Sequence, residues 1–185
     1  MVLHELLRVG AKLLQLRAKT LLPRDFLRLG RETRALTRSH SCRLIVNDRV
    51  DIALACDADG VHLGQDDLPL HAAKKLMSEK IIGISTHDLN QAREAEHNGA
   101  NYIGFGPMFG TSTKKTSYPA RGLAMLHEVR EAVRIPIVAI GGITEANAME
   151  VWQAGADSVA IISDILAAQD ITSKVTRILT QQRNG

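Results

Sequence analysis

The sequence predicts an α/β fold, a (β/α)8 TIM barrel. Short apolar runs alternate strictly with helical patterns, which is typical of a parallel sheet with crossover helices. Polar residues recur at the carboxyl ends of these runs all along the chain rather than at one switch point, which favours a barrel over a doubly wound sheet. The last two units end in a Gly-Gly loop and in a small-residue loop before a short helix, where many barrels bind phosphate.

Seven short apolar runs are predicted to be strands, because each is too short for a helix. In four of them a turn of small residues, with Gly or Asp where a helix ends, leads into the run. These four segments are residues 10–16, 57–63, 99–105 and 155–161. The other three runs are residues 42–46, 81–84 and 135–140.

Helical patterns fill the intervals between the runs. The segment 23–39 has Pro23 at its start, and the last segment is amphipathic, with Ile171, Val175 and Ile178 on one face. The predicted helices span residues 2–9, 23–39, 50–56, 69–78, 89–98, 122–134, 145–154 and 171–182.

Length and composition describe one domain spanning residues 1–185. Hydrophobic residues make up 45% of the 185 residues and charged residues 23%, ordinary values for a globular protein. No apolar run approaches the roughly 20 residues of a membrane helix, and the charged start does not resemble a secretory signal. A formal charge of +3 and few aromatic residues do not indicate nucleic-acid binding, so we expect no nucleic-acid partner. Cys42 and Cys56 have apolar neighbours, so we expect buried, reduced thiols in a cytoplasmic protein.

Three polar residues alternate along the end of the first predicted strand. With a side-chain period of two, Gln15, Arg17 and Lys19 face the same way. At the mouth of a barrel they would offer an amide, a guanidinium and an ammonium group to an anion. The alternative is an edge strand with a solvated polar face, which a parallel sheet covered on both faces makes less favourable.

Acidic residues follow two neighbouring strands. Asn47 and Asp48 come after the run 42–46, and Asp67 comes shortly after residue 63. Carboxylates from two strand ends, together with phosphate oxygens of a substrate, form a typical Mg²⁺ site. The alternative is that these aspartates cap the helices that follow them. Taken alone, either of the two acidic motifs would favour capping over metal binding.

Ser85 ends another predicted strand and is open to two interpretations. Its hydroxyl could donate to a phosphate, or it could cap the helix predicted for residues 89–98. His62, in the run before it, is interpreted as a core histidine with satisfied hydrogen bonds.

Two further features predict phosphate binding. The loop 104–115 contains glycines, threonines and lysines, and we interpret it as a lid over pyrophosphate rather than an ordinary flexible loop. Gly141 and Gly142 precede the helix predicted to begin at residue 145, where backbone N–H groups can approach a phosphate. Residues 161–164 follow the last strand, and the pairing of these two loops favours a phosphate site over a simple tight turn.

Together the motifs resemble the thiamine-phosphate synthase family. The blocks Gln-Leu-Arg-x-Lys, Asn-Asp-Arg, Gly-Val-His-Leu-Gly-Gln-x-Asp, Gly-x-Ser-Thr-His, Gly-Pro-x-Phe-x-Thr-x-Thr-Lys and Ile-Gly-Gly-Ile follow the family's order. The resemblance implies a TIM-barrel transferase of thiamine biosynthesis. It would join hydroxymethylpyrimidine pyrophosphate to hydroxyethylthiazole phosphate and release pyrophosphate.

The resemblance also implies a role for each site residue. The pyrimidine pyrophosphate would be held by Gln15, Arg17, Lys19, Asn47, Ser85 and Lys114. The thiazole phosphate would contact Thr111, Thr113, Gly142, Ile162 and Ser163. Asp48 and Asp67 would hold Mg²⁺. Arg17, Lys19 and Lys114 would be catalytic, because they would stabilise the charge on pyrophosphate as it departs in a dissociative substitution.

The chain differs from the family's pattern at its N-terminus. The first predicted helix begins at residue 2, so we expect the family's first β-strand to be missing and the domain to be N-terminally truncated. Two open sheet edges would result, and a homo-oligomer is expected. Two alternative functions stay open: a phosphate-binding relative without synthase activity, such as a regulator or remnant, and a thiazole tautomerase, which would use a histidine where Pro107 stands.

Overall fold

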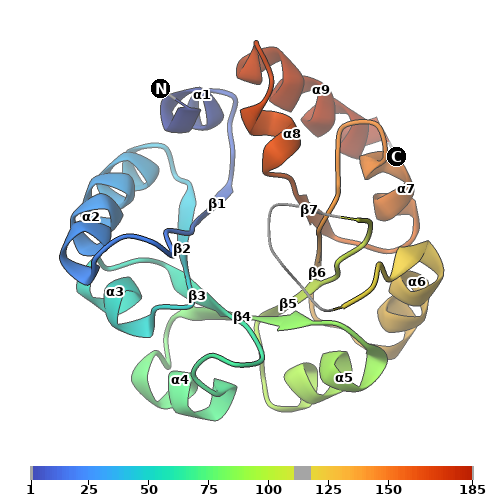
Figure 1. Ribbon diagram of the computed structural model, residues 1–185, viewed down its shortest axis with the longest axis horizontal. Coiled ribbons are helices and arrows are strands. Elements are labelled where there is room, and N and C mark those ends of the chain that lie inside the picture. The colour runs from blue at the N-terminus through green and yellow to red at the C-terminus, as the bar shows by residue number, and fades with distance from the viewer. Residues whose placement is uncertain (1, 111–117, 185) are drawn as a thin grey trace.

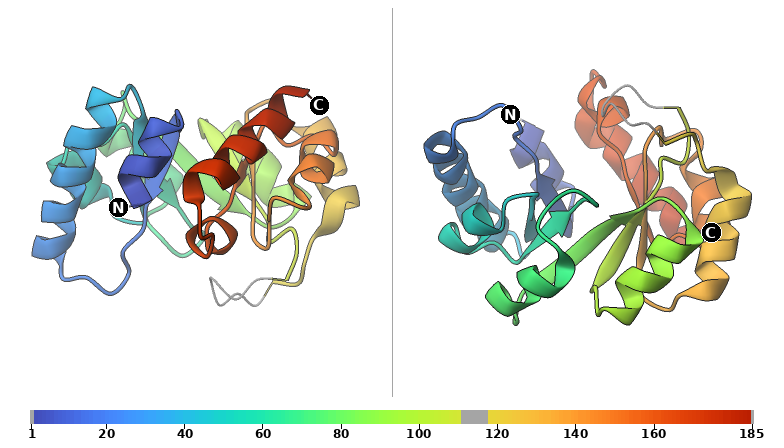
Figure 2. Two further views of the ribbon diagram at one scale, coloured as in Figure 1. Left: turned by 90° about the horizontal axis from the view of Figure 1, so that it is seen from above. Right: turned by 60° about the horizontal axis from the view of Figure 1, so that its bottom comes forward.

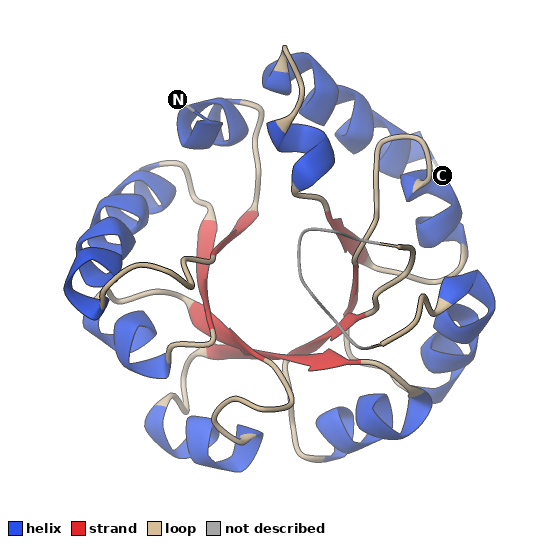
Figure 3. Ribbon diagram, viewed as in Figure 1, coloured by secondary structure: helices blue, strands red, loops and turns tan. Residues whose placement is uncertain are grey.

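The computed structural model describes residues 2–110 and 118–184. Its centre is a parallel sheet of seven strands that pair in chain order, from β1 at one edge to β7 at the other. The strands are β1 Leu13–Leu16, β2 Arg43–Asn47, β3 Gly60–Leu63, β4 Ile81–Thr86, β5 Tyr102–Phe105, β6 Ile137–Ile140 and β7 Ser158–Ala160. Figures 1 and 3 show the strands curving around a common centre with the helices outside. The fold is therefore a parallel α/β arrangement of the TIM-barrel type.

Nine helices lie among the described residues. They are α1 Val2–Arg8, α2 Pro23–Ser39, α3 Val50–Ala55, α4 Leu70–Leu76, α5 Leu89–His97, α6 Gly122–Ala132, α7 Ala148–Gln153, α8 Ser163–Leu166 and α9 Ile171–Asn184. Each helix that the sequence predicts is present. None of the described helices is long and apolar enough to cross a membrane.

The central strands are buried on both faces. All residues of β3 and β5 are buried, as is β2 after its first residue, because helices cover the sheet outside and side chains fill it inside. The edge strands β1 and β7 are only half-buried, and Leu13 is 46% exposed. Within residues 2–110 and 118–184, β1 pairs only with β2 and β7 only with β6. The absence of the family's first strand stays a prediction.

The first and last described helices lie side by side. Helix α1 packs against α9, and Figure 2 shows the two next to each other at the side where β1 and β7 face one another. The apolar face predicted for α9 is confirmed, since Ile171, Val175 and Ile178 are buried. Helix α9 also packs against α7 and α8.

Three of the four small-residue turns predicted before strands share one hydrogen-bonding arrangement. Asp59, just before β3, donates its N–H to the carbonyl of Leu44 (2.9 Å) and accepts from the N–H of Leu44 through its side chain (2.7 Å). Asn101 makes the same pair of bonds with Ile82, at 2.8 Å each. A side-chain acceptor thus replaces a ladder carbonyl at the amino end of each strand.

Asp157 repeats this arrangement before β7. It donates to the carbonyl of Ile137 (2.9 Å) and accepts from its N–H (2.8 Å). Asp59 and Asp157 also each accept from an arginine of a nearby helix, namely Arg34 at 2.6 Å and Arg130 at 2.8 Å. These contacts lie at the amino edge of the sheet, opposite the predicted site, and stabilise the fold.

One helix begins three residues later than predicted. Helix α7 begins at Ala148, not at residue 145. The side chain of Asn147 accepts from the N–H of Thr144 (2.8 Å) and donates to the carbonyl of Gly142 (3.2 Å). These bonds hold residues 142–147 as a closed loop, so Gly142 lies in a loop that precedes the helix rather than at its first turn.

Candidate active site

The predicted site residues that the structure describes all lie at the carboxyl edge of the sheet. Because the strands are parallel, their carboxyl ends meet at one edge. The residues concerned are Gln15, Arg17 and Lys19 on and after β1, Asn47 and Asp48 at β2, Asp67 after β3, Ser85 in β4, Gly142 after β6, and Ile162 and Ser163 after β7. Thr111, Thr113 and Lys114 lie outside the described residues.

The alternation along β1 follows the predicted pattern. Gln15, Arg17 and Lys19 are exposed, whereas the residues between them are half-buried. The Lys19 ammonium lies 3.1 Å from a carboxylate oxygen of Asp48. A cation predicted to bind substrate therefore contacts a predicted metal ligand.

Asp48 and Asp67 form a pair of neighbouring carboxyl groups. The Asp67 side chain accepts from the N–H of Gly64 at 2.7 Å and lies within hydrogen-bonding reach of the Asp48 carboxylate. Burial raises the pKa of Asp67 above its ordinary value, and the Asp48 carboxylate raises it further. Two carboxylates held this close attract a cation or a proton.

Helix capping does not explain these two aspartates. Helix α3 has Arg49 at its N-cap and α4 has Pro69, and neither has a side-chain capping bond among the described residues. Asp48 instead has φ +63°, a left-handed conformation uncommon for a residue with a side chain. The backbone thus turns at the end of β2, where Asp48 meets Lys19.

Ser85 does not cap the following helix. Asp88 is the N-cap of α5 and accepts from the N–H of Gln91 at 2.9 Å. The Ser85 hydroxyl is buried and lies 2.8 Å from His62 Nε2, so the capping interpretation is wrong for this residue.

His62 belongs to a buried polar chain that crosses the inside of the sheet. Its Nδ1 lies 2.9 Å from the Tyr102 hydroxyl, which is also hydrogen-bonded to the Gln15 side chain. Burial raises the pKa of Tyr102, while the bond to Gln15 opposes that shift. His62 is the satisfied core histidine that the sequence predicts, and it connects Ser85 through Tyr102 to Gln15.

Two glycines make room for this chain. A Cβ on Gly83 would lie 2.1 Å from the Tyr102 ring, and one on Gly104 would lie 2.8 Å from the His62 ring. Tyr102 was not among the predicted site residues. The signal was a glycine inside each of two neighbouring strands, which marks a close approach by a bulky neighbour.

The loops after β5 and β6 pack closely together. Met108 and Phe109 donate their N–H groups to the carbonyls of Ile140 (2.8 Å) and Gly141 (3.0 Å). Gly142 has φ +70°, and a Cβ there would lie 2.6 Å from the carbonyl oxygen of Gly110. Only glycine fits this position without displacing the neighbouring loop.

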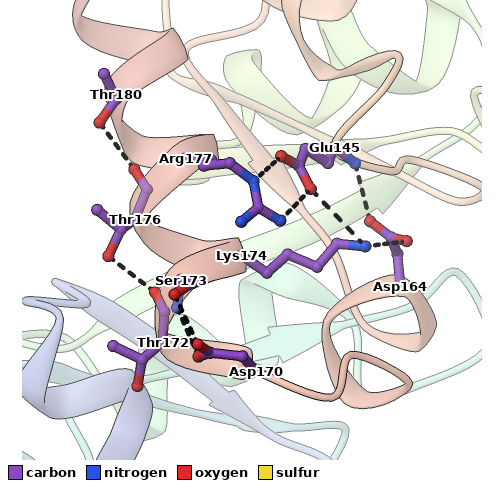
Figure 4. Close-up of polar contacts among 9 residues, drawn as sticks. All are labelled: Glu145, Asp164, Asp170, Thr172, Ser173, Lys174, Thr176, Arg177 and Thr180. Atoms are coloured by element: carbon purple, nitrogen blue, oxygen red, sulfur yellow. Dashed lines mark hydrogen bonds and ion pairs between the residues drawn. The ribbon is translucent and has the colours of Figure 1, made fainter.

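The loops after β6 and β7 are also joined. The N–H of Glu145 donates to the Asp164 side chain at 2.9 Å, as Figure 4 shows. Asp164 directly follows Ser163, which is exposed, as is Ile162. The predicted phosphate contacts on these two loops are therefore held near one another.

Comparison with known proteins identifies the family. A family model described as thiamine monophosphate synthase matches residues 1–165. The chain belongs to the thiamine monophosphate synthase family. The thiamine-phosphate synthase of Chloroflexus aurantiacus is 47% identical over 169 residues, 91% of this chain and 78% of that protein. The synthase of Halalkalibacterium halodurans is 45% identical over 185 residues, 98% of this chain and 88% of that protein.

Solved structures agree with the family assignment. Thiamine phosphate pyrophosphorylase from Pyrococcus furiosus matches with a TM-score of 0.93 and 39% identity, over 99% of this chain and 88% of that one. A 3-hexulose-6-phosphate synthase matches with a TM-score of 0.75 at 17% identity, over 97% of this chain and 92% of that one, which shows the shared fold alone. The thiamine monophosphate synthase family therefore accounts for both the motifs and the fold.

Proposed function

We propose that this chain is a thiamine-phosphate synthase, a transferase that joins hydroxymethylpyrimidine pyrophosphate to hydroxyethylthiazole phosphate and releases pyrophosphate. The observation that carries the proposal is the contact between Lys19 and Asp48, which lies beside Asp67. This contact is at the carboxyl edge of the sheet, where the predicted cationic residues lie. A carboxylate pair and basic side chains side by side suit a ligand that carries both negative charge and a divalent cation.

The carboxylate pair fits Mg²⁺. Within the described residues no third His, Cys, Asp or Glu joins Asp48 and Asp67 in a cluster. Such a site leaves most of the ion's oxygen ligands to water and substrate phosphate, as Mg²⁺ prefers. When bound, Mg²⁺ would neutralise negative charge on the pyrophosphate.

The residues of this chain supply the remaining interactions. Arg17 offers two parallel donors and Lys19 a point charge, and both would stabilise the charge that develops on pyrophosphate as it leaves. Gln15, Asn47 and Ser85 would hold the pyrimidine substrate, with Ser85 and Gln15 oriented by His62 and Tyr102. The departing group leaves a pyrimidine carbocation, which the thiazole nitrogen captures, so no side-chain nucleophile is required.

The second substrate would bind across the last two strands. Gly142 offers a backbone approach, and Ser163 offers a hydroxyl at the start of α8. The phosphate of the thiazole would lie between these loops, which orients its ring nitrogen toward the pyrimidine.

Direct assay of the reaction tests the proposal. The two substrates are incubated with the protein and Mg²⁺, and thiamine phosphate is measured by chromatography. We expect product with the wild type, and a loss of at least about a hundredfold with Asp48→Ala. Absence of product, or a D48A variant as active as the wild type, would refute the proposal. Glu79→Ala, on the amino side of β4, is the matched control that keeps activity.

A further inference from the structure

An ion-pair network joins α9 to the two loops that follow β6 and β7. The Asp164 side chain accepts from the backbone N–H of Glu145 at 2.9 Å through one oxygen and from the Lys174 ammonium at 2.6 Å through the other. Figure 4 shows Lys174 reaching from α9 to Asp164, with Glu145 beside both. One carboxylate thus connects three separate segments of the chain.

Glu145 extends the network to a second residue of α9. Its carboxylate accepts from Arg177 at 2.5 and 3.1 Å, and one of its oxygens lies 4.0 Å from the Lys174 ammonium. The side chain of Lys174 is 17% exposed and that of Asp164 22%, whereas Arg177 is 57% exposed. Because screening by water weakens exposed pairs most, the Lys174–Asp164 pair is the stronger restraint.

Helix α9, which carries Lys174, is held in place by buried side chains and by an N-terminal cap. The buried residues Val175 and Ile178 hold the helix on the barrel. Asp170 caps its start, accepting from the N–H of Ser173 at 2.9 Å and from the Ser173 hydroxyl at 2.7 Å. The ammonium of Lys174 is therefore presented from a helix whose position and first turn are both fixed.

The network reaches the proposed phosphate contacts through short, closed loops. Ser163 directly precedes Asp164, and both lie in the first turn of α8. Gly142 lies three residues before Glu145, within the loop that Asn147 closes by bonding to both Thr144 and Gly142. The Glu145–Asp164 bond therefore ties the loop that holds Gly142 to the segment that begins with Ser163.

We propose that Lys174 is a positioning residue, which acts through Asp164 and Glu145 to hold the two loops that bind the thiazole phosphate. This inference rests on the proposed function. Direct attraction of the phosphate by Lys174 is not the mechanism, because its charge and that of Arg177 are balanced by the carboxylates of Asp164 and Glu145. Lys174 sets geometry rather than supplying charge to the ligand.

The electrostatics of Asp164 agree with this arrangement. Burial alone would raise the pKa of Asp164, but the Lys174 ammonium and the Glu145 N–H outweigh burial and lower it. The carboxylate is therefore charged at neutral pH and can hold both donors.

A matched ion pair at the other end of the same strand provides the control. Asp157, before β7, accepts from the N–H of Ile137 at 2.8 Å and from Arg130 at 2.8 Å. It thus joins the same two units by the same chemistry, but at the amino edge of the sheet. Arg130→Met removes an equivalent cation without touching the proposed phosphate loops.

The experiment compares Lys174→Met, Lys174→Arg and Arg130→Met in steady-state kinetics with each substrate varied in turn. We expect K174M to raise KM for hydroxyethylthiazole phosphate about tenfold, with kcat and KM for the pyrimidine pyrophosphate changed by less than about twofold. K174R should have a KM for hydroxyethylthiazole phosphate close to that of the wild type, because arginine keeps the positive charge. R130M should lower Tm at least as much as K174M, because Arg130 also donates to the carbonyls of Val133 and Ile135, and it should leave both KM values unchanged.

Three outcomes would overturn the inference: an unchanged KM for the thiazole phosphate in K174M, an equal rise in both KM values, or the same kinetic effect in R130M. If K174M does not fold, Asp164→Asn serves instead, since it keeps an acceptor for Glu145 but loses the ion pair.

Failure of the proposed function would look different. In that case the wild type makes no thiamine phosphate. The rate of hydrogen exchange at the Glu145 backbone amide then tests the network without any need for turnover. This rate should be faster in K174M than in the wild type and unchanged in R130M. Equal exchange in K174M and wild type would overturn the positioning itself.

Discussion

Nε2 of His62 lies 2.8 Å from the Ser85 hydroxyl, and both side chains are buried. His62→Leu would leave the hydroxyls of Ser85 and Tyr102 without this partner. We expect a loss of about 2–3 kcal/mol in the free energy of unfolding and a raised KM for the pyrimidine pyrophosphate. Urea unfolding and steady-state kinetics measure the two effects. His62→Gln, which keeps a polar side chain, should lose less in both, and a variant pair with equal losses would contradict the prediction.

The carboxylate pair predicts opposite effects on stability and on activity. Asp67→Asn removes one negative charge from beside Asp48, and its amide oxygen can still accept from Gly64. In Mg²⁺-free buffer we expect Tm to rise by about 2–4 °C, which corresponds to roughly 1 kcal/mol at this chain length. Synthesis of thiamine phosphate should fall steeply, because a ligand of the proposed Mg²⁺ site is lost. Thermal denaturation with and without Mg²⁺ checks this, and a lowered Tm in the absence of the ion would contradict it.

A third prediction concerns stability in acid. Glu96 on α5 accepts from the N–H groups of Arg134 (2.5 Å) and Ile135 (3.0 Å), in the loop between α6 and β6. The Arg134 N–H holds the pKa of Glu96 below its ordinary value of 4.5, although burial opposes this. Since the folded pKa is lowered, the contribution to stability is present above 4.5 and is lost as pH falls through the folded value.

Glu96→Gln isolates that contribution. At neutral pH we expect E96Q to be less stable than the wild type by about 0.5–1 kcal/mol, because a neutral acceptor bonds these two N–H groups more weakly. The difference should shrink below about pH 4.5 and vanish once Glu96 is protonated. Urea unfolding at a series of pH values gives the comparison, and a difference that stays constant into acid would show that charge on Glu96 is not its source.

Most of the fold could be predicted because burial leaves a pattern in the chain. Strands such as β3 and β5 are buried on both faces and therefore appear as short continuous apolar runs. The start of α7 was misplaced because Asn147 bonds back to Thr144 and Gly142, a side-chain interaction that competes with the first helical turn.

The site was predicted less completely than the fold. The strand-end position of Asp48 and Asp67 was visible in the sequence, whereas excluding the capping alternative needed the structure, in which Arg49 and Pro69 occupy the N-cap positions of α3 and α4. Tyr102 escaped prediction because an aromatic residue in a buried strand is usually core. Only the structure shows that its hydroxyl joins His62 to Gln15.

The side-chain acceptors at the amino edge of the sheet provide the last prediction. Asp59 accepts from Leu44 N–H and from Arg34, whose side chain is only 15% exposed. Asp59→Ala leaves both a buried N–H and a largely buried guanidinium without this acceptor, so we expect a loss of about 2–4 kcal/mol. Asn101→Ala removes only the acceptor for Ile82 and should cost about 1–2 kcal/mol. In Asp157→Ala, Arg130 still donates to the carbonyl of Val133 at 2.6 Å. We therefore expect this variant to lose about 1–2 kcal/mol as well.

Urea unfolding of the three variants ranks these losses. We expect the largest loss of stability in Asp59→Ala, since this variant alone leaves a largely buried charge without its partner. Asp59→Asn keeps the acceptor for Leu44 but not the ion pair, and should fall between the wild type and D59A. Because these residues lie at the edge opposite the proposed site, KM for both substrates should stay at the wild-type value in every variant that folds. A loss in D59A no larger than in N101A would show that Arg34 finds another partner, and a change in either KM would show that the two edges of the barrel are coupled.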